Sequence, residues 1–214
     1  MPQIITQRED FIDEQVLAEA KKLLDAGRLI CFPTDTVYAL AASCTHSEAT
    51  KHIYQLKARD ANKPLALLTA SLEQAKTIAI LDDRATRIAQ HFLPGALTLI
   101  VPLRPDTPLN PAINAGLTTI GLRIPNHPFA LALLRYYGAP MIATSVNLSG
   151  EESATSTAMI PATFLPHIDL IIDGGHSPIG LSSTVVDVTG DEVMILRQGT
   201  VQKEDIMRCI KDFS

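Results

Sequence analysis

The 214-residue sequence predicts a layered α/β domain, with an open, mixed sheet inside and helices outside. Several segments repeat apolar residues at helical spacing, and short β-branched runs lie between them. The order is not a regular strand–helix alternation, because only residues 189–192 separate the strand candidates 184–188 and 193–197. That spacing suits an antiparallel hairpin and therefore a mixed sheet.

The N-terminal half begins with a helical stripe over residues 9–26, which includes Phe11 and Ile12 and is stopped by Gly27. Residues 47–57 resume this period, with Ser47 as the predicted N-cap. The remaining elements of this half are strands at 28–32 and 64–68, and two helices within 72–92 broken near 81–83.

The C-terminal half is rich in strand candidates, separated by loops with turn residues. They are residues 96–103, 118–125, 140–145, 167–173, 183–189 and 192–197, with helices expected at 127–137 and 203–212. Residues 102–116 are rich in Pro and Asn and predict a surface loop. Residues 149–166 are small and polar, and we interpret them as a mobile flap.

Composition places the chain among globular proteins, with 46% apolar residues and a mean hydropathy of +0.16. We expect residues 1–214 to form a single domain. No apolar run approaches the ~20 residues of a membrane helix, and the N-terminus lacks signal-peptide features. The three cysteines form no C-x-x-C pair, so we expect reduced thiols and a cytoplasmic location. The net charge of −5 argues against a generally basic nucleic-acid surface but permits a local basic groove.

Polar residues gather where the predicted strands begin or end, which is where open α/β sheets bind ligands. Singly, each cluster is compatible with a turn or a helix cap. The clusters are Thr34–Asp35–Thr36, Arg123, Thr144–Ser145 with Asn147, Ser182–Ser183–Thr184, and Arg197. A basic stretch, KARDANKP at residues 57–64, accompanies them and is by itself compatible with a solvated face.

The sequence has no phosphate-binding G-x-x-x-x-G-K-[ST], no G-x-G-x-x-G after a strand and no G-x-S-x-G. Its six histidines show no zinc-ligand spacing. The remaining Lys, Arg, Ser, Thr and Asn residues bind and neutralise phosphates without supplying a covalent nucleophile. We therefore expect a polyanionic partner, in particular a nucleotide.

Six motifs in this order resemble those of the YrdC/TsaC family of threonylcarbamoyl-AMP synthases, from about residue 15 to about residue 200. They are PTDTVYAL, KARDANKPL, TIGLRIPNHP, ATSVNLSG, SSTVVDVT and ILRQG. The resemblance implies a twisted open sheet with a large, partly positive concave face. It also implies synthesis of threonylcarbamoyl-AMP from L-threonine, bicarbonate and ATP, with release of pyrophosphate. A separate transferase complex would then modify an adenosine in tRNA.

By the same resemblance, Lys57 and Arg59 match the family's K-x-R pair, and Ser145 and Asn147 its S-x-N pair; these four are the predicted catalytic residues. The implied ATP-binding residues are Arg59, Lys63, Thr119, Asn147, Thr155 and Arg197. The implied threonine-binding residues are Thr36, Arg123, Ser145 and Ser183. Mg²⁺ is expected to arrive with ATP rather than in a dedicated protein site.

Two positions depart from the family pattern. Ala39 replaces a frequent Gly, and Leu68 stands where some members have a His that helps to hold the amino acid. TIGLRIP and DLIIDGG also resemble YciO-type paralogues, so one alternative is a protein that binds tRNA or double-stranded RNA with little synthase activity. The other alternative is a nucleotide-dependent carbamoyl or adenylyl transferase without preference for threonine.

Overall fold

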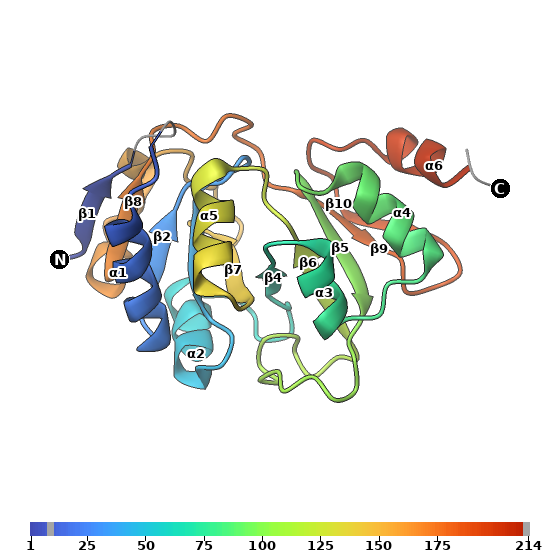
Figure 1. Cartoon of the computed structure of the whole chain (residues 1–214), viewed down its shortest axis with the longest axis horizontal. Helices are drawn as coiled ribbons and strands as arrows, with labels where there is room; N and C mark the ends of the chain where they lie inside the picture. The colour runs from blue at the N-terminus through green and yellow to red at the C-terminus, as the bar shows by residue number, and fades with distance from the viewer. Residues whose placement is uncertain (8–10, 212–214) are drawn as a thin grey trace.

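The computed structural model describes residues 1–7 and 11–211, which form one twisted, ten-stranded sheet running across the molecule (Figure 1). The strands are β1 (Gln3–Thr6), β2 (Ile30–Phe32), β3 (Ala39–Ser43), β4 (Ala66–Leu68), β5 (Leu97–Pro102), β6 (Thr119–Arg123), β7 (Met141–Ser145), β8 (Leu170–Asp173), β9 (Thr184–Asp187) and β10 (Met194–Arg197). The helices are α1 (Glu14–Asp25), α2 (Ser47–Leu56), α3 (Leu72–Ile78), α4 (Asp83–Phe92), α5 (Pro128–Tyr137) and α6 (Lys203–Lys211), with 3₁₀ turns η1 (Thr157–Met159) and η2 (Leu165–His167).

The sheet is mixed and open, as predicted, with the order β1-β8-β2-β3-β7-β4-β6-β5-β9-β10. β8 is parallel to β1 and β2, β4 to β6, and β5 to β9, whereas the other neighbours are antiparallel. β9 and β10 form the predicted hairpin, with a register irregularity between Ile195 and Arg197. Strands distant in sequence thus become neighbours at the centre of the sheet.

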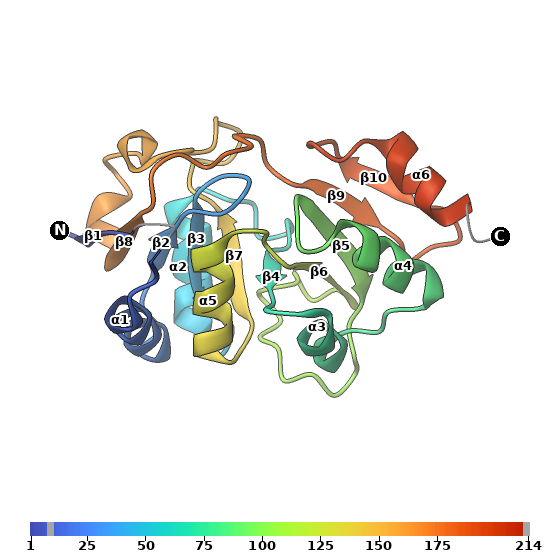
Figure 2. The same ribbon diagram turned by 45° about the horizontal axis from the view of Figure 1, so that its top comes forward.

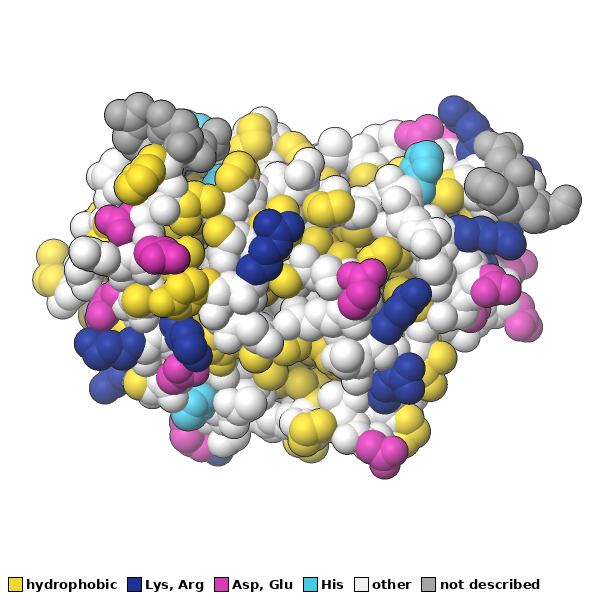
Figure 3. Space-filling view, viewed as in Figure 1, with side chains coloured by type: hydrophobic (Ala, Val, Ile, Leu, Met, Phe, Trp, Pro, Cys, Tyr) yellow, Lys and Arg dark blue, Asp and Glu magenta, His cyan; other side chains and the backbone are white. Residues whose placement is uncertain are grey.

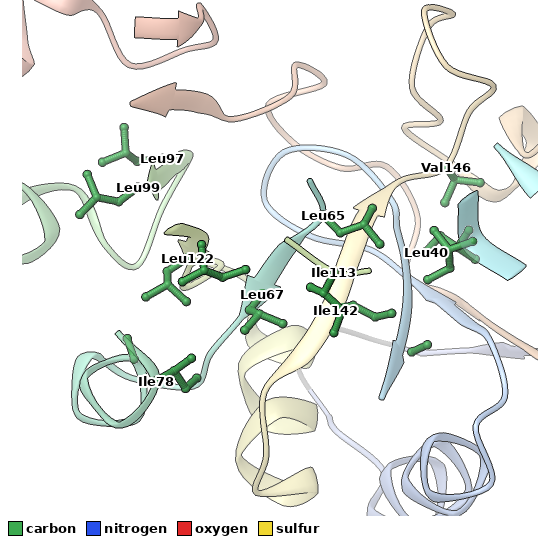
Figure 4. Packing of buried hydrophobic residues seen from close by; sticks show 14 of the residues in the cluster. Leu40, Leu65, Leu67, Ile78, Leu97, Leu99, Ile113, Leu122, Ile142 and Val146 are labelled. Atoms are coloured by element: carbon green, nitrogen blue, oxygen red, sulfur yellow. The ribbon is translucent and has the colours of Figure 1, made fainter. Parts of the chain in front are cut away.

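Two hydrophobic clusters pack on opposite faces of the sheet. Successive residues of β4 divide between them, with Leu67 in one cluster and Leu68 in the other, as the alternation of a strand requires. The Leu68 cluster includes the buried faces of α1 and α5. The Leu67 cluster includes buried residues of α2, α3, α4 and α6, and Figure 4 shows Leu67 and Ile142 packed within it.

Helix starts were the least accurate part of the helix prediction. The first helix begins at Glu14 rather than at residue 9, because the Asp13 side chain caps it by accepting from the Gln15 N–H at 2.8 Å. Phe11, predicted to join its apolar stripe, precedes the helix and is 68% exposed, and residues 9–10 lie outside the described residues. In α2 the predicted N-cap Ser47 is wrong, because His46 occupies that position without a side-chain cap bond.

Two strands, β1 and β3, were not predicted. β3 has the sequence ALAAS, and alanine is weakly favoured in strands, so the segment gives little local signal. All five of its residues are nevertheless buried, because β2 and β7 pair with it on both sides. Ala39 lies in this strand and is not among the residues with positive φ, so the backbone there does not need glycine.

The predicted flap at 149–166 is largely built into the fold. The Ala154 N–H donates to the Val146 carbonyl at 3.0 Å, and the Tyr38 N–H donates to the Ala154 carbonyl at 2.9 Å. Ala154 and Phe164 are fully buried in the core. In Figures 1 and 2 this β7–β8 connection runs with the β8–β9 connection along the upper edge of the sheet. The segment is therefore anchored to the core through Ala154 and Phe164.

The predicted surface loop between β5 and β6 contains buried residues. The Leu65 N–H donates to the Ile113 carbonyl at 2.8 Å, and both Ile113 and Asn114 are buried, so this loop is tied to the segment that precedes β4.

None of the helices among residues 1–7 and 11–211 has the length and apolar character needed to cross a membrane.

Candidate active site

One half of one sheet face carries polar side chains and belongs to neither hydrophobic cluster. Gly121 in β6 pairs with Ala66 and Ile100, and Thr98 in β5 pairs with Val185. Directly paired residues point to the same side, as do residues two apart in a strand. That face therefore also carries Thr119, Arg123 and, through the β9–β10 pairing, Arg197. None of these residues belongs to either hydrophobic cluster.

Lys57 is buried beneath the S-x-N turn. It is the C-cap of α2 and only 1% exposed. Its Nζ donates to the main-chain oxygens of Ser145 at 2.5 Å and Asn147 at 2.6 Å, and to Asn147 Oδ1 at 3.0 Å. Lys57 is therefore not part of the solvated face with which the basic stretch was compatible. The reason is positional, because Lys57 follows the buried Ile53 and Tyr54 by four and three residues and shares their inward face.

The surroundings of Lys57 exert two opposite effects on its charge. Burial, with a smaller contribution from the charge of Arg59, lowers the pKa of Lys57 to about 7. The three oxygen acceptors match the three N–H donors of an ammonium group and favour the charged form. With these acceptors within 3.0 Å, we assign an ammonium that holds the turn together.

The S-x-N turn is satisfied internally. Ser145 Oγ donates to Asn147 Oδ1 at 2.6 Å. Asn147 Nδ2 donates to the carbonyls of Leu148 at 2.9 Å and Glu151 at 2.8 Å. The structure thus brings Lys57, Ser145 and Asn147 together as the motifs implied, and it uses the Asn147 amide to shape the turn.

Arg59 organises the basic loop that follows α2. Its Nε donates to the Lys63 carbonyl at 3.0 Å, and its Nη2 to the Pro64 carbonyl at 2.8 Å. The side chain of Lys63 is exposed. Ala66 pairs with Gly121 in the parallel strands β4 and β6. Thr119 and Pro64 are each two residues earlier, so Thr119 lies beside Pro64, next to this loop. Three of the residues implied to bind ATP, Arg59, Lys63 and Thr119, therefore lie in one region.

Arg123 forms a buried ion pair with Asp35. Its Nη2 lies 2.6 Å from Asp35 Oδ1, its Nη1 donates to Thr36 Oγ1 at 2.7 Å, and its Nε donates to the Gly95 carbonyl at 3.0 Å. The predicted proximity of Arg123 and Thr36 is thus observed. The same contacts also describe a structural salt bridge between two strand-end segments. Burial lowers the pKa of Arg123, and the Asp35 carboxylate opposes that shift.

Ser183 lies at the start of β9, where three strands meet. Arg197 Nη2 donates to the Ser183 carbonyl at 2.9 Å and to its Oγ at 3.2 Å. Thr98 Oγ1 lies 2.8 Å from the same Oγ. Thr98 was missed in the sequence, although it is the one hydroxyl-bearing residue in the apolar run ALTLIVPL, and a buried hydroxyl requires a partner.

Thr155 joins the site through the two upper connections. Its carbonyl accepts from the Ser177 N–H at 2.8 Å, and its Oγ1 contacts Met159 Sδ at 3.1 Å. The Ile179 and Gly180 N–H groups donate to the carbonyls of Asp35 and Thr36 at 3.0 and 2.9 Å. The 174–182 connection therefore links Thr155 with the loop that carries Thr36.

Four cations from distant parts of the chain act on one another electrostatically. Burial is the main cause of the lowered pKa values of Lys57 and Arg197, and the charge of Arg59 lowers both further. Arg197 in turn contributes to the lowered pKa of Arg123. We call Lys57, Arg59, Arg123 and Arg197 the cationic group. The arrangement is suited to binding an anion with several charges.

No three His, Cys, Asp or Glu residues among those the structure describes are grouped so that they can hold a metal ion. A surface cavity of about 460 Å³ lies along α6 between Lys203 and Lys211, and another of about 130 Å³ lies between Gly27, His52 and His167. Neither is lined by a predicted site residue.

Leu68, which stands where some family members have a His, is buried in the hydrophobic cluster that includes α1 and α5.

The Sua5/YciO/YrdC family model, described as telomere recombination, matches residues 22–199. A Bacillus subtilis protein named threonylcarbamoyl-AMP synthase is 40% identical over 203 residues, covering 94% of this chain and 58% of that protein.

Two solved structures share the fold. The crystal structure of Pyrococcus abyssi Sua5 complexed with L-threonine has a TM-score of 0.90 and 38% identity, covering 97% of this chain and 60% of that one. The Escherichia coli YciO structure has a TM-score of 0.87 and 28% identity, covering 94% of this chain and 98% of that one. The chain thus spans about three-fifths of the length of the first two relatives and nearly all of the third.

Proposed function

Because the chain belongs to the Sua5/YciO/YrdC family, we propose that it makes threonylcarbamoyl-AMP from L-threonine, bicarbonate and ATP and releases pyrophosphate. The observation that carries the proposal is the strand pairing that brings Arg123 and Arg197 onto one face of the sheet, in contact with Thr36 and Ser183, which are expected to hold threonine. The threonine complex of a 38% identical relative supports the choice of amino acid. We place the reaction in the cytoplasm, as a nucleotidyl transfer.

The reaction needs positioning more than it needs a protein nucleophile. The threonine amine first forms a carbamate, either by adding to CO₂ with release of a proton or by reacting with bicarbonate with release of water. A carbamate oxygen then attacks the α-phosphorus of ATP, and pyrophosphate leaves in line with the attack. The cations of the site neutralise charge on the triphosphate. The Asp35 carboxylate is engaged by Arg123, so Mg²⁺ would be held by the phosphates of ATP, where it would neutralise further charge.

We assign the roles residue by residue. Arg59, Lys63 and Arg197 would contact the phosphates of ATP, and Thr119, Thr155 and Asn147 the rest of the nucleotide. Arg123, Thr36, Ser145 and Ser183 would hold threonine. Lys57 would act mainly by fixing the S-x-N turn, because its Nζ contacts two main-chain oxygens of that turn. Lys57, a predicted catalytic residue, would thus position the turn rather than contact the phosphates.

The product is a reactive mixed anhydride, so a downstream enzyme must consume it. We propose that a threonylcarbamoyl transferase complex uses it to modify an adenosine of tRNA. The second candidate is a YciO-type function in which tRNA or double-stranded RNA is the main ligand. The near-complete coverage of E. coli YciO favours it. On the face shown in Figure 3, Lys and Arg side chains are interspersed with Asp and Glu, so the described residues of that face form no basic stripe suited to a nucleic-acid backbone.

Pyrophosphate release tests the proposal. With Mg²⁺, the protein should release pyrophosphate only when ATP, L-threonine and bicarbonate are all present, and labelled bicarbonate should appear in an adenylate. L-Serine lacks one methyl group and should be poorer by roughly 10-fold. Release that ignores threonine would favour the general transferase. Absence of release together with tight, salt-sensitive RNA binding would favour the YciO-type function.

A further inference from the structure

The hydroxyl of Ser183 has two buried neighbours that determine which way its hydrogen points. Ser183 is 4% exposed and Thr98 is 6% exposed. Ser183 Oγ lies 3.2 Å from Arg197 Nη2 and 2.8 Å from Thr98 Oγ1. Because a guanidinium group carries only donors, Ser183 Oγ accepts the bond from Arg197.

The bond to Thr98 can also be assigned a direction. Among the described residues, the Thr98 hydroxyl has no hydrogen-bond partner other than Ser183 Oγ. In either direction one of the two buried hydroxyl hydrogens has no acceptor among the described residues. A threonine bound at Ser183, as proposed above, removes this equivalence, because it can accept the hydrogen of Ser183 and thereby avoids a buried unpaired donor. With threonine bound, Thr98 therefore donates. Both lone pairs of Ser183 Oγ are then occupied, and its own hydrogen remains for a further acceptor.

The backbone around Thr98 holds this geometry. A Cβ atom placed at Gly121 would lie 3.3 Å from the Thr98 methyl carbon Cγ2, so that methyl group packs directly over Gly121. A β-branched side chain has few favourable χ1 angles. With its methyl group over β6, Thr98 keeps Oγ1 against Ser183, where β5 runs parallel to β9.

We propose that Thr98 is a positioning residue that makes Ser183 a hydrogen-bond donor, so that this end of the site selects an anionic oxygen, the carboxylate of the amino acid. The inference rests on the proposed function and adds a residue to it. The neighbouring Arg123 and Arg197 are donors as well, and the Asp35 carboxylate at this end is already engaged by Arg123. A ligand group that itself donates, such as a carboxamide, is disfavoured there.

The test compares Thr98→Val, which keeps the shape and lacks the hydroxyl, with Thr98→Ser, which keeps the hydroxyl. Thr50→Val is the matched control, because Thr50 is a buried threonine whose Oγ1 bonds within its own helix, to the His46 carbonyl. We expect Thr98→Val to raise KM for L-threonine about 10-fold, the effect of one hydrogen bond to a charged group, while KM for ATP and kcat change less. The preference for L-threonine over L-threoninamide should fall. Thr98→Ser and Thr50→Val should stay close to the parent.

Calorimetric binding of L-threonine to the same variants separates this inference from the proposed function. If the parent binds threonine without releasing pyrophosphate, the function fails, and the binding constants still decide the role of Thr98. Unchanged threonine affinity in Thr98→Val, equal losses for threonine and ATP, or no rescue by serine would overturn the inference, as would a parent that binds no threonine. Thr98→Ala serves as the second hydroxyl-free variant if the valine variant does not fold.

Discussion

At the scale of single residues, Lys57 belongs to a basic motif, but it is buried and its ammonium group stabilises the fold. Replacing Lys57 by Met removes the donor that holds two main-chain oxygens, and we expect a loss of about 1–3 kcal/mol in the free energy of unfolding. Lys51→Met, on the exposed side of the same helix, should change it by less than about 0.5 kcal/mol. Urea denaturation of both variants measures the difference. If Lys57→Met were as stable as Lys51→Met, the hydrogen bonds of Lys57 would contribute nothing to stability.

At the scale of elements, the backbone just after β10 lies very close to the backbone at the start of β9. A Cβ atom at Gly199 would lie 2.3 Å from the Ser182 carbonyl oxygen and 2.5 Å from the Thr184 nitrogen. Gly199→Ala must therefore push these strands apart, at a cost of roughly 1–3 kcal/mol, and displace Ser183.

Gly190 provides the matched control, because it lies in the same hairpin, and an added Cβ would have its nearest contact at 4.0 Å. Denaturant melts and threonine titrations of both variants decide the matter. We expect Gly199→Ala to lose stability and threonine affinity together, and Gly190→Ala to lose neither. Parent-like behaviour of Gly199→Ala would show that the strands separate there without consequence.

At the scale of the whole molecule, ligand binding should stabilise the fold, because the site joins segments from Thr36 to Arg197. A ligand that binds only the native state adds RT ln(1 + [L]/Kd), about 2.7 kcal/mol at 100-fold excess over Kd. ATP with Mg²⁺ should therefore raise Tm, and AMP should raise it less.

Lys63→Met should reduce this ATP-dependent shift without changing the Tm of the free protein, because the Lys63 side chain is exposed. Lys76→Met, a charge change in α3, should leave the shift intact. Thermal melts with and without ATP are the measurement. Equal shifts with AMP and ATP would argue against recognition of the outer phosphates.

The sequence by itself determined the class of fold and most of its elements. Periodicity is a local property, so the stripes of α4 and α5 and the apolar runs of β5 to β8 were predictable from a few neighbouring residues. The types of residue at the strand ends also indicated binding of a polyanion. β3 escaped prediction because its alanines fit a buried position without signalling a strand.

Only the tertiary structure decided which side chains meet. The contacts Lys57–Ser145, Asp35–Arg123 and Thr98–Ser183 each join residues 85 to 88 positions apart. They depend on the order of strands in the sheet, which places β7 beside β4 and β5 beside β9. Strand order follows from packing of the whole chain rather than from any local pattern. For that reason the sequence indicated a cation at Lys57, whereas only the fold placed it beneath the S-x-N turn.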